Sequence, residues 1–230
     1  MGSRGLSSKK LGNTKFVMSE YGVRVDMRTY RKTNKEHLER GLQGIQELIA
    51  DMNLSKDMVP FINMSCIPLP LFTLGKCSLN YKEDDTNDIF ISKSSMEESS
   101  DLPYINVKIT KTYIHEYIHA LESALIKMNL SDGADRIIAW NDCEFARGII
   151  SKAIESFGGK ASAWKRYAGR ISDYAKTDHS EALAEIGSHY VIALRNNFAG
   201  YTKSEIRFMR SVMNTFRNEL KHLKGYRKSK

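Results

Sequence analysis

The feature that most constrains this chain is the pentapeptide HEYIH at positions 115–119. In an α-helix, residues four apart lie one turn apart on the same face, so the side chains of His115 and His119 can reach one ion. Two imidazoles in this arrangement suit Zn²⁺, which binds histidine nitrogen at about 2.0–2.1 Å. Glu116, beside the first histidine, can then take a proton from a water at the ion. The motif therefore predicts a helix with a site for one Zn²⁺.

The residues around the motif predict that helix independently. Apolar residues recur with the 4, 3, 4 spacing of one helical face, at Ile114, Ile118, Leu121 and Leu125. The two histidines and Glu122 occupy the neighbouring face, where the floor of a cleft is expected. The helix is predicted over 109–129, because Ser131-Asp132-Gly133 follows it.

The other segments predict an α+β fold, predominantly helical, with a small mixed or antiparallel sheet. Further helices are predicted over 34–52, 134–157, 178–196 and 202–223, and strands over 61–67, 77–81 and 88–92. The predicted organisation is a disordered basic N-terminus over 1–15, an N-terminal helical segment over 16–60 and a domain over 61–225.

Composition limits the class of protein without naming an activity. The 230 residues are 41% hydrophobic and 27% charged, which is ordinary for a soluble globular domain. Neither a secretory signal nor a membrane span is predicted, so a cytoplasmic or virion-associated protein is expected. The net charge of +8 favours anionic partners, and basic residues interleaved with aromatic ones make nucleic acid a partner to consider, although a less favoured one.

A catalytic zinc site needs a third protein ligand. The continuation HExxHxxGxxH is absent, because Glu122 and Leu125 occupy its glycine and histidine positions. The third ligand must come from elsewhere in the chain. Five candidates remain open: Glu144, His179, Glu181, Glu185 and His189.

Two segments together resemble the zinc metallopeptidases related to anthrax lethal factor. These are gluzincins that also occur in phage and mobile-element proteins, often beside Mu F-type head morphogenesis domains. The first segment is HEYIHALE, and the second matches the family pattern S-x-Y-[AG]-x-[TS]-[ND]-x-x-E-x-[FL]-A-E. The resemblance covers about 110–190. The matched positions of the second segment include Ser172, Tyr174, Ala175, Thr177, Asp178, Glu181, Ala184 and Glu185.

The resemblance implies a zincin-like fold and a role for each matched residue. Glu181 would join the two histidines as the third zinc ligand, and Glu116 would be the general base. Tyr174 would donate a hydrogen bond to the developing oxyanion or the leaving group. Glu122 and Glu185 would hold the ligands in place through hydrogen bonds. The chain departs from the family in having Ala182-Leu183 after the ligand glutamate, where the family usually has an aromatic residue.

The implied activity is hydrolysis of a peptide or protein substrate by a zinc-dependent endopeptidase. An extended substrate would pair with an edge strand beside the motif helix, in 88–92 or 78–81. Two other functions remain open. One is a phage or mobile-element structural or packaging protein with little activity, whose partners are virion proteins. The other is a basic nucleic-acid-binding module, which would bind in a salt-sensitive way.

Overall fold

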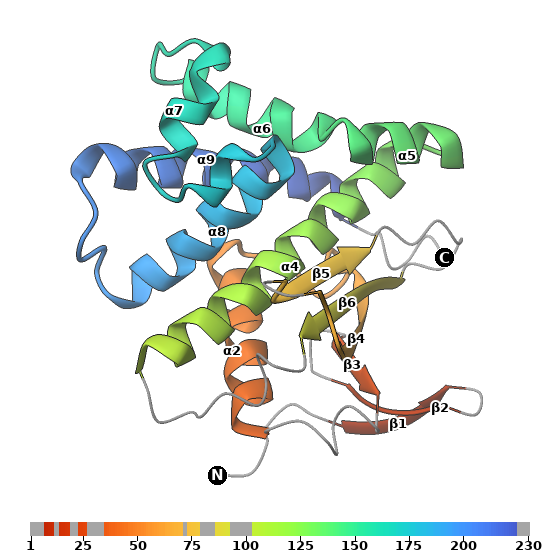
Figure 1. Cartoon of the computed structure of the whole chain (residues 1–230). Coiled ribbons are helices and arrows are strands. Elements are labelled where there is room, and N and C mark those ends of the chain that lie inside the picture. The colour runs from red at the N-terminus through yellow and green to blue at the C-terminus, as the bar shows by residue number, and fades with distance from the viewer. Residues whose placement is uncertain are drawn as a thin grey trace.

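The fold is described from a computed structural model of the chain, which places residues 7–11, 14–18, 23–26, 35–70, 73–78, 86–92 and 103–224. Helices predominate and one mixed sheet accompanies them, which confirms the α+β class (Figure 1). None of the helices in these segments is long and apolar enough to cross a membrane. Residues 79–81 of the predicted strand 77–81 lie outside the described residues.

The sheet has six strands in the order β1-β2-β3-β4-β6-β5. Its central part is parallel, with β3 (Val23–Asp26) beside β4 (Phe61–Ile67) and β4 beside β6 (Thr86–Ser92). The flanks are antiparallel: β1 (Ser7–Leu11) pairs with β2 (Thr14–Met18), β2 with β3, and β5 (Gly75–Ser78) with β6. Among the described strands β5 is therefore an edge strand, and its Gly75 lies against Glu116 of the HEYIH motif.

The N-terminal part of the chain differs from the prediction. Strand β1 lies within 1–15, where disorder is predicted, and β2 crosses the boundary between that segment and the segment 16–60, which is predicted to be helical and which contains β3. All three strands belong to the same sheet as β4, β5 and β6, so the predicted boundary at residue 61 does not divide the sheet. Residues 1–6 and 12–13 of the predicted disordered segment lie outside the described residues.

The helices mostly follow the prediction. They are α2 (Lys35–Asp51), α4 (Pro103–Asn129), α5 (Gly133–Asn141), α6 (Glu144–Glu155), α7 (Trp164–Ala168), α8 (His179–Arg195) and α9 (Lys203–Leu220). The single helix predicted over 134–157 is wrong, because α5 ends at Asn141 and Cys143 adopts a left-handed conformation with φ of 51° before α6 begins. That turn lets α6 pack on both α8 and α9.

Helix α4 is the centre of the molecule and carries the HEYIH motif. It runs diagonally between the sheet and α2 on one side and the α6–α9 helices on the other (Figure 1). Glycines allow the two neighbouring helices to approach it closely. A Cβ added at Gly41 in α2 would lie 2.4 Å from the Tyr113 ring, and one at Gly187 in α8 would lie 2.3 Å from Ile118 Cδ1. The side chains of His115 and His119 are consequently buried, in contact with α8 rather than with bulk water.

Candidate metal centre

Three side chains from two helices meet beside the sheet edge. His115 and His119 come from α4 and Glu181 from the first turn of α8, which is capped by Asp178 through a 2.8 Å hydrogen bond from the Glu181 backbone N–H. His115 Nε2 lies 3.2 Å from His119 Nε2 and 3.0 Å from Glu181 Oε2, and His119 Nε2 lies 3.7 Å from Glu181 Oε2. Tetrahedral ligands about 2.0–2.1 Å from Zn²⁺ are about 3.3–3.4 Å apart, so these separations match a common ion.

The second nitrogen of His115 is fixed by a carboxylate on α8. His115 Nδ1 lies 3.2 Å from Glu185 Oε1, and the other oxygen of Glu185 accepts a 2.9 Å hydrogen bond from Lys111 Nζ. Glu185 was among the residues predicted from the sequence, whereas Lys111 was not. The position of Lys111 one helical turn before His115 was the available signal. With Nδ1–H donating to Glu185, the lone pair of His115 is on Nε2.

The second nitrogen of His119 is fixed through a hydroxyl. Ser180 Oγ donates a 2.5 Å hydrogen bond to Glu122 Oε2 and lies 3.0 Å from His119 Nδ1. A hydroxyl has one proton, so Ser180 accepts from His119 Nδ1–H, and the lone pair of His119 is also on Nε2. The other oxygen of Glu122 accepts a 3.2 Å hydrogen bond from the backbone N–H of Ala146 in α6. We call the hydrogen-bonded series His119–Ser180–Glu122 the relay.

These hydrogen bonds leave an arrangement that a cation would satisfy. When both histidines are neutral, their Nε2 lone pairs face each other at 3.2 Å. Glu181 Oε2 is then buried with no hydrogen-bond donor among the described residues. Three acceptors directed at one point repel one another unless a positive charge lies between them. The residues present therefore fit a metal ion held by two imidazoles and one carboxylate, which is a ligand set typical of zinc.

The pKa values show how strongly the site favours positive charge. Burial opposes ionisation of His119, yet the carboxylates of Glu122 and Glu181 beside it outweigh burial and raise its pKa to about 10. Burial alone would raise the pKa of Glu181, but the two histidines lower it. The pKa of Glu185 is lowered too, because His115, His189 and Lys111 outweigh its burial. A bound metal ion would replace the protons that these carboxylates otherwise hold on the histidines.

Glu116 lies beside the two histidines but is covered by strand β5. It is buried, which raises the pKa of its carboxyl, with the two nearby histidines acting in the opposite direction. Gly75 of β5 covers it, because a Cβ added at Gly75 would lie 2.6 Å from Glu116 Oε1. Gly75 was not predicted from the sequence, where the available signal was a glycine beside a short predicted strand.

A cleft opens over these groups between β5 and α8. It consists of two hollows of about 540 Å³ and 420 Å³, which share Thr73, Gly75, His115, Glu116 and Tyr174 in their walls. Tyr174 is 54% exposed. Its ring lies 6.2 Å from that of His115, and burial followed by the charge of Glu181 raises its pKa to about 12. The phenol therefore keeps its proton at neutral pH.

The other candidate ligands lie away from the three-residue group. Glu144 is exposed at the start of α6. His179 stacks on Trp164 with ring centroids 4.0 Å apart, and His189 Nδ1 hydrogen-bonds to the Tyr201 hydroxyl at 2.6 Å. Glu185 faces the outer nitrogen of His115. Among the described residues, Glu181 is thus the candidate that joins the two motif histidines.

Comparison of the chain with family models, with curated proteins and with solved structures gives no match in any of the three.

Proposed function

We propose that the protein is a zinc-dependent endopeptidase with a zincin-like fold, and that His115, His119 and Glu181 hold one Zn²⁺. The observation that carries the proposal is the set of three acceptors with matched separations, each histidine oriented by its own hydrogen bond. A zinc ion bound there supplies Lewis acidity, which polarises a scissile carbonyl and acidifies an attacking water. The lethal factor-like family is the one whose motif the chain resembles.

Glu116 has the properties of the general base in this proposal. Its raised pKa brings it closer to neutral pH, where a carboxylate can accept a proton and later return it to the leaving amine. Contact with Gly75 limits the positions its carboxylate can occupy.

Tyr174 is placed to donate a hydrogen bond to charge that develops on the substrate. It lies in the short helix η2 (Tyr174–Lys176), and its backbone N–H donates a 3.1 Å hydrogen bond to Ser172 Oγ. A phenol with a pKa near 12 remains a donor throughout the neutral range.

The shape of the cleft supports an extended peptide as substrate. Hollows on both sides of Glu116 leave room for chain before and after a scissile bond, as an endopeptidase requires. β5 uses one edge to pair with β6, and no other described strand pairs with its second edge, which we propose receives the peptide backbone. Of the two segments considered from the sequence, 78–81 and 88–92, the second lies in the interior strand β6.

The test compares the purified wild type with Glu116→Gln, a substitution that keeps the shape of the side chain. We expect about one zinc per chain in both proteins by elemental analysis, and cleavage of unfolded casein only by the wild type. Glu144→Gln is the matched control, because it makes the same change at an exposed position outside the cluster. A wild type that retains no zinc, or a Glu116→Gln variant that cleaves at the wild-type rate, would overturn the proposal.

A further inference from the structure

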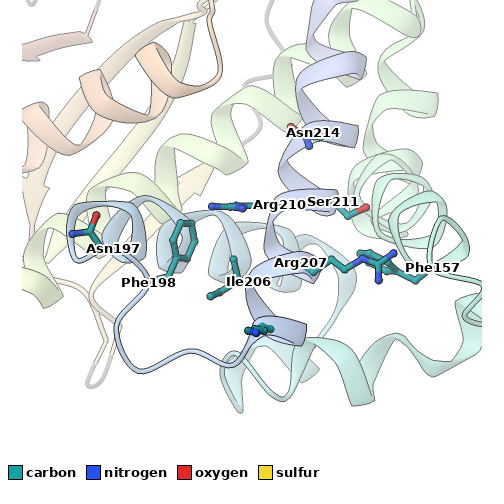
Figure 2. Close-up of a pocket in the computed structure, with 9 residues that line it drawn as sticks. Phe157, Asn197, Phe198, Ile206, Arg207, Arg210, Ser211 and Asn214 are labelled. Carbon is teal, nitrogen blue, oxygen red and sulfur yellow. The ribbon is translucent and has the colours of Figure 1, made fainter.

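A second hollow lies on the helical side of the molecule and shares no wall residue with the metal cleft. It has a volume of about 640 Å³ and is formed by α9, the turn after α8 and the end of α6 (Figure 2). Its volume is within the range of ligand sites in proteins. The proposed peptidase chemistry makes no use of it.

The charge of this groove is entirely positive. Lys203, Arg207 and Arg210 are its only ionisable wall residues, and no carboxylate lines it. They occupy positions i, i+4 and i+7 of α9, so they follow one face of the helix over about 10 Å. In the part of the chain that the structure places, none of the three forms an ion pair, whereas Lys152 and Arg195 elsewhere on the helices each pair with a glutamate.

The two arginines are held in position by aromatic rings. The guanidinium of Arg207 lies 4.9 Å from the centroid of Phe157, and that of Arg210 lies 4.9 Å from the centroid of Phe198 (Figure 2). Phe198 and Asn197 have φ of 57° and 49°, a conformation that costs free energy in residues other than glycine. This strained turn places the Phe198 ring in the groove. A guanidinium that is already held against a ring loses less side-chain entropy on binding a carboxylate than a freely moving one does.

We propose that this groove docks an acidic peptide segment of a protein partner. An extended peptide places alternate side chains on one face about 7 Å apart, so acidic residues at every second position can meet cations along α9. Asn197 and Asn214 add neutral hydrogen-bonding groups to the same walls. Single-stranded nucleic acid fits less well, because it needs open aromatic faces for base stacking and here arginines cover Phe157 and Phe198.

The experiment measures binding of a fluorescein-labelled peptide of alternating Glu and Ser to the full chain by fluorescence anisotropy. Mass spectrometry verifies that the peptide stays intact. The groove variant carries Lys203→Gln, Arg207→Gln and Arg210→Gln. The control variant removes the same charge at exposed positions outside the groove, through Lys160→Gln, Lys221→Gln and Lys224→Gln. Thermal melting verifies that both variants fold.

We expect the groove variant to bind about tenfold more weakly and the control variant to bind as the wild type does. Wild-type binding should weaken as NaCl is raised, and a peptide with Gln in place of Glu should not bind. Equal weakening in both variants would overturn the proposal, since it would indicate attraction to net charge alone. Oligo(dT) that displaces the peptide and binds more tightly than it does would also overturn the proposal. A groove variant that does not fold is replaced by Lys203→Gln alone, for which about a twofold loss is expected.

Discussion

The contact between Gly75 and Glu116 makes the proposed general base sensitive to a single methyl group. In Gly75→Ala, the new Cβ would lie 2.6 Å from Oε1, 2.7 Å from Cγ and 2.9 Å from Cδ of Glu116. Ordinary van der Waals contact begins at 3.4 Å, so the carboxylate must withdraw by up to about 0.8 Å. The three nearest atoms all belong to the Glu116 side chain, which can shift without unfolding β5.

A displacement of about 1 Å at a reacting group costs about 100-fold in rate. We therefore expect kcat/KM for a quenched fluorescent peptide cut by the wild type to fall about 100-fold in Gly75→Ala. The zinc content should be unchanged, because Glu116 is not among the three ligands, and the free energy of unfolding should fall by about 1 kcal/mol.

Gly148→Ala is the matched control for this substitution. Nothing lies within 4 Å of a Cβ added at Gly148, and this residue is inside helix α6. We expect unchanged activity and a gain of about 0.5–1 kcal/mol in stability. The reasoning is refuted if Gly75→Ala cleaves at the rate of Gly148→Ala, or if it loses its zinc.

The remaining predictions concern metal affinity and helix packing. Ser180→Ala should weaken zinc binding about 10- to 100-fold in competition with a chelating dye, and unchanged affinity would contradict the relay to the histidine. Gly187→Ala, whose Cβ would lie 2.3 Å from Ile118 Cδ1, should lower the free energy of unfolding in urea by about 1–3 kcal/mol. Asp178→Ala removes the cap of α8 and should cost about 1 kcal/mol, measured the same way. Adding EDTA should remove about 2.7 kcal/mol of stability from a protein that had zinc at 100 times its dissociation constant, seen as a lower Tm.

The local part of the site was predictable because it depends on helical spacing. His115, Glu116 and His119 lie within five residues, so the geometry of a single helix is enough to bring them together. The relay from His119 through Ser180 to Glu122 was not predictable from spacing, because it joins positions 58 residues apart. The position of Glu181 beside the histidines depends on the same packing of α8 on α4. Only the family resemblance distinguished it from the other candidate ligands.

The differences between the predicted and the observed elements also have local causes. The hairpin of β1 and β2 was missed, although Gly12-Asn13 between two short runs is a recognised turn signal, because the flanking lysines suggested a disordered tail. The break between α5 and α6 was missed because Cys143 is not a residue that usually adopts a positive φ. Tertiary packing of α6 fixes that break, and periodicity does not detect it.

The length of β5 has a consequence for behaviour in solution. An unpaired strand edge is a template on which other chains can add, and long flat edges lead to aggregation. Over the described residues, β5 has four residues, with Gly75 at its start and the candidate metal site beside it. In the proposed peptidase, four such residues would fix the register of one bound peptide, but they offer little length on which a second copy of the sheet could add. Substitutions that lengthen the exposed edge of β5 are therefore expected to reduce solubility more than they improve substrate binding.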